Sequence, residues 1–135
     1  MKKKFKIKKS YLFLGIIVLF VFGTFLFFRI QEDGWVRDSR GVYVKHGDPS
    51  ETPDYVLEQQ AVIKCALELY ELVSEQGIEF FSQCIGTCGD FAVDIVHVPR
   101  NSEDELEENQ CLEYSLGNVS HFIELDKNGD VVRIF

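Results

Sequence analysis

The stretch QCIGTCGD, residues 83–90, stands between two β-prone segments and decides how the C-terminal part of the chain folds. The flanking segments, IEFFSQCIG at residues 78–86 and FAVDIVHV at residues 91–98, are rich in β-branched and aromatic residues. This composition predicts two antiparallel strands joined at the quoted stretch. Alternation gives the second strand two faces, with Phe91, Val93, Ile95 and His97 on one and Ala92, Asp94 and Val96 on the other.

Cys84 and Cys88 are two of the four cysteines of the chain. If they end paired strands around a three-residue loop, their Cα atoms lie about 4.5–5.5 Å apart, within the roughly 4.4–6.8 Å that a disulfide requires. Cys65 and Cys111 then remain for a second bond. We therefore predict the pairs 84–88 and 65–111. The other two pairings stay open, because connectivity cannot be read from sequence.

The same cysteines suggest two other kinds of chemistry. A thiol–disulfide oxidoreductase could use Cys84 and Cys88, but their C-x3-C spacing differs from the C-x-x-C of thioredoxin-like enzymes, and no βαβ pattern surrounds them. A zinc site completed by Cys111, His97 and His121 lacks a second closely spaced ligand pair. The oxidoreductase remains the alternative function.

A nucleophilic arrangement of Cys88, His97 and Asp94 is also conceivable. Asp94 and His97 point to opposite faces of one predicted strand, which argues against it. His97 at a strand end is more simply a partly buried, hydrogen-bonded histidine. We therefore expect no catalytic residue, no metal site and no cofactor, and we predict that all four cysteines form disulfides.

A long amphipathic helix is predicted upstream of the strands. Thr52 can cap it, Pro53 suits its first position, and Asp54 favours the positive end of the helix dipole. Gly77 can end it. Apolar residues at three- and four-residue steps form one stripe that includes Cys65: Tyr55, Val62, Cys65, Ala66, Leu69, Leu72 and Val73.

Two further signals lie downstream of the strands. Ser102 and Glu105 form a capping-box pattern, and Gly117 can end a short surface helix there. The chain closes with HFIELDKNGDVVRIF, residues 121–135, where Asn128-Gly129 between two β-prone runs predicts a hairpin. We expect an α+β fold in which one long helix crosses an antiparallel sheet.

The N-terminal part has a different composition. YLFLGIIVLFVFGTFLFF, residues 11–28, contains no charged residue. As a helix it would reach roughly 27 Å, close to the ~30 Å of a hydrocarbon core. The run is apolar all round, which predicts a single transmembrane helix over residues 11–30. A cleaved signal peptide would have a shorter apolar region followed by small residues, which the sequence FLFFRIQED lacks.

Charge predicts the orientation of this helix. Six lysines precede the apolar run, so the positive-inside rule places residues 1–10 in the cytoplasm as a basic tail. Residues 31–51 then form a juxtamembrane hairpin (35–45) and a linker, and residues 52–135 form an exported domain. Because thiols tend to oxidise outside the cytoplasm, this location agrees with two disulfides.

The exported part is strongly acidic. Residues 30–135 hold all 22 acids and seven bases, a net charge of −15, which opposes nucleic-acid binding. A basic leader, one anchor and a small acidic domain form a layout common among bacterial surface proteins. We predict a non-enzymatic, membrane-anchored protein that binds an envelope protein or a surface ligand, or that takes part in envelope organisation. The NVS sequon at Asn118 is a glycosylation signal only in a eukaryotic secretory pathway.

Overall fold

The computed structural model describes residues 9–30 and 33–135, with side chains in the first helix described at residues 11 and 13–25. The chain divides into two compact units. One holds the first helix and the residues up to 34 together with residues 45–49, and the other holds residues 35–44 and 50–135. Most of the predicted basic tail, residues 1–8, lies outside the described residues.

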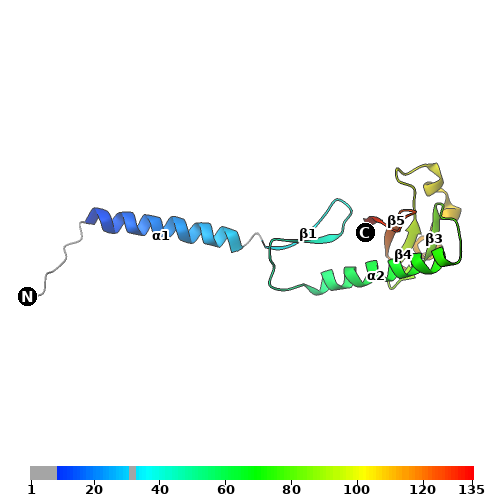
Figure 1. Ribbon diagram of the computed structural model, residues 1–135, viewed down its shortest axis with the longest axis horizontal. Helices are drawn as coiled ribbons and strands as arrows, with labels where there is room; N and C mark the ends of the chain where they lie inside the picture. Colours follow the sequence, from blue (N-terminus) through cyan, green and yellow to red (C-terminus); the bar gives the residue numbers. More distant parts are fainter. Residues whose placement is uncertain (1–8, 31–32) are drawn as a thin grey trace, which may run out of the picture. The chain divides into compact units, whose positions relative to one another are not determined.

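The first helix, α1, spans Lys9–Ile30 and confirms that the apolar run is helical (Figure 1). Its described side chains are exposed. Among these side chains, the Thr24 hydroxyl donates to the Val21 carbonyl at 2.9 Å. Within residues 9–30 and 33–135, no helix has the combined length and hydropathy of a membrane-spanning segment.

A hairpin follows α1. β1 (Gly34–Arg37) and β2 (Tyr43–His46) form a two-stranded sheet. The Asp38 carboxylate organises the loop between them by accepting from the backbone N–H groups of Arg40 and Val42 at 2.9 and 3.0 Å. The β-prone runs in the sequence predicted this hairpin, and Asp38 shows how its loop is held.

Gln59 holds the loop of the hairpin within the second unit. The Gln59 side chain accepts from the Tyr43 N–H at 2.7 Å and donates to the Gly41 carbonyl at 2.9 Å. Gly41 has a φ of +84°, and a Cβ there would collide with the Ile134 carbonyl oxygen. Only glycine therefore allows the loop to approach the sheet this closely.

The long helix, α2, spans Asp54–Glu75. Its N-cap is Pro53, and no side chain caps it, so the predicted Thr52 cap is wrong by one position. Gly77, with a φ of +69°, follows the last turn, as predicted. Tyr55 and Leu72 were assigned to the buried stripe but are exposed.

Four strands form the main sheet, in the order β3–β4–β5–β6: β3 (Gln83–Cys88), β4 (Phe91–Ile95), β5 (His121–Leu125) and β6 (Val131–Ile134). β3–β4 and β5–β6 are antiparallel hairpins, whereas β4 and β5 are parallel. The prediction of a wholly antiparallel sheet is therefore wrong at its centre. Parallel neighbours need a crossover of about a dozen residues or more, and residues 96–120 supply it.

The crossover contains three short helical segments, whereas the sequence predicts a single short helix. It consists of two 3₁₀ turns and one α-helical turn: Ser102–Glu105, Glu107–Asn109 and α3 (Leu112–Ser115). A capping box forms between Asn101 and Asp104, one residue before the predicted pair Ser102 and Glu105. Gly117 follows α3 with a φ of +73°.

The unit that holds residues 35–44 and 50–135 contains three layers, with the four-stranded sheet between α2 and the crossover. The core between α2 and the sheet contains Ala66, Cys88, Val93, Ile95, Ile123, Leu125 and Ile134. The smaller core on the opposite face contains Ala92, Cys111 and Val119, with Phe122 packed against it. The alternation predicted for β4 is confirmed, since Val93 and Ala92 belong to different cores.

Candidate functional site

The structure contains two disulfides, Cys65–Cys88 and Cys84–Cys111, with Cα–Cα distances of 5.9 and 4.8 Å. The prediction that all four cysteines are bonded is confirmed. The predicted pairing, 84–88 with 65–111, is wrong. Cys84 and Cys88 belong to different bonds, which removes the pair on which an 84–88 oxidoreductase depended.

The error came from the position of the turn. Cys84 and Cys88 both lie on β3, and the chain reverses after Cys88, which pairs with Phe91. The register shifts between Cys84 and Gly86, so one extra residue bulges from the strand. The bulge changes which face each later side chain takes.

This shift assigns one cysteine to each face of the sheet. Cys84 lies opposite Asp94, whereas Cys88 lies opposite Phe91, and these two positions of β4 face opposite sides. The Cys65–Cys88 bond consequently ties α2 to the sheet, and the Cys84–Cys111 bond ties the sheet to the crossover.

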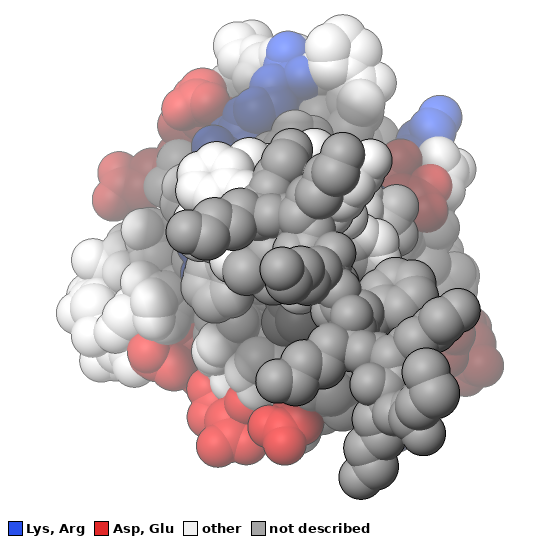
Figure 2. All heavy atoms as spheres, turned by 90° about the vertical axis from the view of Figure 1, so that its left-hand side faces the viewer, with Lys and Arg blue, Asp and Glu red and all other residues white. Residues whose placement is uncertain are grey.

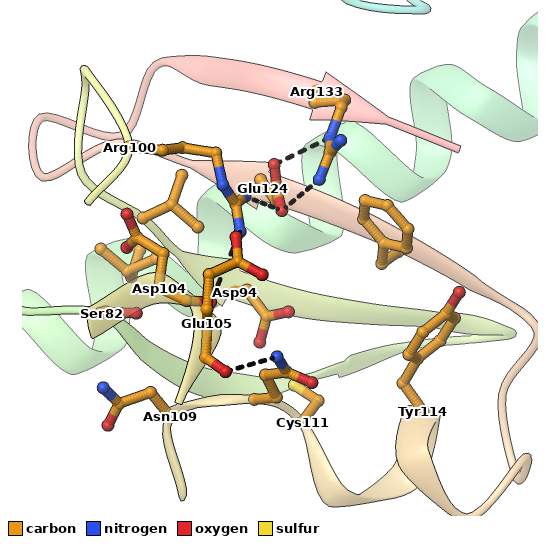
Figure 3. Close-up of a pocket in the computed structure, with 14 residues that line it drawn as sticks. Ser82, Asp94, Arg100, Asp104, Glu105, Asn109, Cys111, Tyr114, Glu124 and Arg133 are labelled. Atoms are coloured by element: carbon orange, nitrogen blue, oxygen red, sulfur yellow. Dashed lines mark hydrogen bonds and ion pairs between the residues drawn. The ribbon is translucent and has the colours of Figure 1, made fainter. Parts of the chain in front are cut away.

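A cavity of about 200 Å³ lies between the sheet and the crossover, beside Cys111 (Figure 3). Charged side chains from four parts of the chain line it: Asp94, Arg100, Asp104, Glu105, Glu124 and Arg133. Tyr114 and Phe122 add an aromatic wall, with their rings edge to face at 5.4 Å. Its six charged side chains come together from separate parts of the chain, and we treat it as the candidate site.

Glu124 on β5 is the centre of the charge network. Its side chain is 6% exposed and receives Arg100 at 2.6 Å and Arg133 at 2.8 and 3.0 Å. Figure 3 shows the two guanidinium groups converging on it from different sides. Arg133 also lies over the rings of Phe122 and Phe135, at 5.0 and 5.3 Å. Glu124 is therefore fully paired and serves to position both arginines.

Asp104 holds the start of the crossover. It accepts from the backbone N–H groups of His97 and Asn101, at 3.0 and 2.8 Å, and its Oδ1 lies 3.0 Å from His97 Nδ1. Burial alone would raise the pKa of Asp104, but these hydrogen bonds, with one from Ser82, outweigh it and lower the pKa to about 2. Asp104 is therefore ionised and structural.

Asp94 has the opposite environment. Its Oδ1 is buried and has no hydrogen-bond partner. Burial, together with the charge of Glu124, raises the pKa of Asp94 to about 7, although the Cys111 N–H and Arg100 act in the other direction. A carboxyl group that exchanges a proton near neutral pH is chemically useful, unlike the saturated Glu124 and Asp104.

Asp94 is also next to a disulfide. A carboxylate oxygen of Asp94 and the Sγ atoms of Cys84 and Cys111 all lie within 4.8 Å of one another. While the two sulfurs are bonded to each other, they are not thiolates and are poor metal ligands. The arrangement therefore brings a buried acid close to a disulfide.

The other residues considered in the sequence are not gathered at one site. His97 is partly buried and hydrogen-bonded, as predicted, and the structure identifies its partner as Asp104. His121 lies beside Asp90, at 3.8 Å. Cys88 is buried on the α2 side, away from the face that carries Asp94. Neither the zinc set nor the Cys88–His97–Asp94 arrangement is assembled among the described residues.

Sequence reasoning missed the roles of Glu124, Arg100 and Arg133. One signal was available: Asp94 and Glu124 are single acids within mostly apolar strands, FAVDI and HFIEL. An acid in such a position must be paired or protonated. Parallel pairing places the two acids directly opposite each other, which the sequence does not indicate.

No protein-family model matches the chain, and no curated protein and no solved structure is significantly similar to it. The function of this small α+β unit with two disulfides is therefore inferred from its own residues and contacts.

Proposed function

We propose that the protein is anchored in the cell membrane by one N-terminal helix and carries an extracytoplasmic domain that binds an envelope protein or a surface ligand. The observation that supports this proposal most directly is the presence of a disulfide on each face of the sheet. Such bonds persist in oxidising compartments and are rare in the cytosol.

The anchor is supported by α1 and the sequence before it. The described side chains of α1 are exposed and mostly large and apolar, including Phe13, Leu19, Phe20 and Phe25. Transfer of such side chains from water to hydrocarbon is favourable by about 25 cal/mol per Å². The lysines at the N-terminus favour the orientation with the domain outside.

Binding is supported by the charge and shape of the domain. Acidic side chains lie on several sides of the described surface in Figure 2, in keeping with the net −15 of residues 30–135. This charge would steer a cationic partner towards the domain and repel an anionic one. Tyr114 and Phe122 supply an aromatic wall at the cavity, and aromatic residues are enriched in binding interfaces.

The location is tested with a reporter fused after Phe135 in intact cells. The expected result is activity only when the reporter is outside the cytoplasm, with full-length protein retained in carbonate-washed membranes. A reporter active in the cytoplasm would refute the orientation. A shortened protein in the medium or periplasm would refute the anchor.

Binding is tested by placing a photo-crosslinking amino acid at Tyr114, with Leu67 on the exposed side of α2 as the control position. We expect a specific adduct from position 114 that weakens as salt is raised. Equal adducts from both positions, or none from position 114, would argue against a binding role for the cavity.

A further inference from the structure

Cys84 and Cys111 differ sharply in access. Cys84 is exposed, whereas Cys111 is 1% exposed and packed in the smaller core. The exposed residue Cys84, rather than the buried Cys111, is therefore the expected point of attack for an incoming thiolate. Attack at Cys84 makes Cys111 the leaving group, since thiol–disulfide exchange expels the sulfur that is not attacked.

The leaving sulfur departs into surroundings that disfavour a thiolate. Cys111 is buried, and both Asp94 and Glu124 lie on the same side of the sheet. Burial in such surroundings favours the neutral thiol over the thiolate. Exchange would therefore be slow unless a proton donor stood next to Cys111.

Asp94 is the acid of the cavity that lies close to this disulfide, near enough to act directly after a small movement or through one water. Its carboxylate lies within 4.8 Å of both sulfurs, and its buried Oδ1 is unpartnered. The neighbouring carboxylates are committed elsewhere, because Glu124 is held by two arginines and Asp104 by backbone N–H groups. No other acid described in the cavity combines this proximity with a free oxygen.

We propose that Cys84–Cys111 is a thiol–disulfide exchange site, at which an accessible cysteine thiol of a partner protein becomes bonded to Cys84 while Asp94 gives a proton to Cys111. The partner thiolate attacks Cys84 Sγ, the bond between Cys84 and Cys111 breaks, and a bond between Cys84 and the partner sulfur forms. The electron pair of the broken bond leaves with Cys111, which becomes a thiol, and Asp94 regains a proton from solvent. The partner sulfur is oxidised and Cys111 is reduced, so atoms and electrons balance.

The second disulfide permits this reaction without loss of the fold. Cys65–Cys88 joins α2 to the sheet within the main core and is independent of the crossover. It remains intact when Cys84–Cys111 opens. The inference rests on the proposed function only in placing the partner outside the cytoplasm. The test uses purified protein, so the exchange reaction can fail while the proposed location holds, and the reverse.

The test uses the full-length protein in detergent micelles with reduced glutathione as the thiol probe. Samples are alkylated at intervals, and both disulfides are followed by peptide mass spectrometry. We expect a glutathione adduct on Cys84 and a free thiol on Cys111, formed at least about tenfold faster than opening of Cys65–Cys88, because access and proton supply favour the first bond. An adduct mainly on Cys111, or equal reactivity of both bonds, would overturn the proposal without any variant.

The pH profile tests Asp94. The variant Asp94→Asn should slow the reaction of Cys84–Cys111 about a hundredfold at pH 6, which is the lower end of what general acid catalysis contributes. The difference should shrink above about pH 7, where the wild-type carboxyl has lost its proton. Charged groups that share the cavity with Asp94 are Glu124 on β5, Arg133 on β6, and Arg100, Asp104 and Glu105 in the crossover.

Asp130→Asn is the matched control, since Asp130 is an exposed aspartate in the β5–β6 turn. It should leave both rates unchanged. The rate of Cys65–Cys88 opening in the same digests reports whether Asp94→Asn has loosened the fold. An unchanged Cys84–Cys111 rate and pH profile in Asp94→Asn would show that Asp94 is not the proton donor.

Discussion

Cys84 and Cys88 lie on the same strand, β3, and face opposite sides of the sheet. Residues four apart on a regular strand share a face. The bulge between Cys84 and Gly86 breaks that rule and sends one cysteine to Cys65 and the other to Cys111. One extra residue therefore determines the connectivity of both disulfides.

Both disulfides should contribute similarly to stability. Their sequence separations are 23 and 27 residues, so the chain-entropy model gives about 3.5 kcal/mol for each bond. We expect Cys65→Ala with Cys88→Ala, and separately Cys84→Ala with Cys111→Ala, to lower the free energy of unfolding by about this amount in urea. Peptide mapping of the wild type that found Cys84 bonded to Cys88 would contradict the structure.

The number of residues between Cys84 and Cys88 should set their faces only together with the bulge. Deleting Ile85 removes the bulge and leaves Cys84 three positions before Cys88, so the two cysteines still face opposite sides of the sheet. We expect this variant to keep the Cys84–Cys111 bond, as measured by peptide mapping and a count of free thiols. Ile85→Val keeps the bulge and serves as the control. Loss of Cys84–Cys111 in the deletion variant would show that the bulge itself, and not the face that Cys84 takes, is needed for the pairing.

Glu124 should be the most costly carboxylate to remove from the cavity. Glu124→Ala leaves Arg100 and Arg133 without their shared partner, and we expect a loss of about 3 kcal/mol in the free energy of unfolding. Glu105→Ala is the control, because Glu105 is exposed and pairs only with Arg100 within the described chain. Its loss should be under about 1 kcal/mol. Similar losses for both variants, by urea unfolding, would contradict the central role of Glu124.

Asp94 should make the domain less stable as the pH rises. Its pKa is raised to about 7 in the folded state, so between about pH 4 and pH 7 the native protein binds more protons than the unfolded one, and stability falls as pH increases. We expect Asp94→Asn to be more stable than the wild type at pH 8, by about 1 kcal/mol or more. The gain should vanish near pH 4. Parallel stability–pH curves for the wild type and Asp94→Asn would contradict the raised pKa of Asp94.

Asp104 should act in the opposite sense. Its pKa is lowered to about 2, so its contribution to stability is present above about pH 4 and disappears as the pH falls towards 2. Asp104→Ala also leaves the N–H groups of His97 and Asn101 without partners, and we expect a loss of about 1–3 kcal/mol at pH 6. Urea unfolding at pH 6 and at pH 2.5 measures both effects, with Asp130→Ala as the exposed control. A loss that persists unchanged at pH 2.5 would contradict the ionised state of Asp104.

The sequence by itself determined the elements and most of their faces. The three- and four-residue spacing of apolar residues located α2, alternation assigned Val93 and Ala92 to different sides of β4, and Asn128-Gly129 marked the last turn. These features depend on side-chain period and local backbone preference, which are properties of neighbouring residues. The even number of cysteines in the acidic part likewise indicated that all four are bonded.

Only the tertiary structure decided which elements meet. Parallel pairing of β4 with β5 follows from the path of residues 96–120 across the sheet, and this path brings Cys111 to Cys84 and Glu124 beside Asp94. The bulge in β3 then sets the face of each cysteine. Such outcomes depend on register and long-range packing, to which residues far apart in sequence contribute together, so no local pattern specifies them.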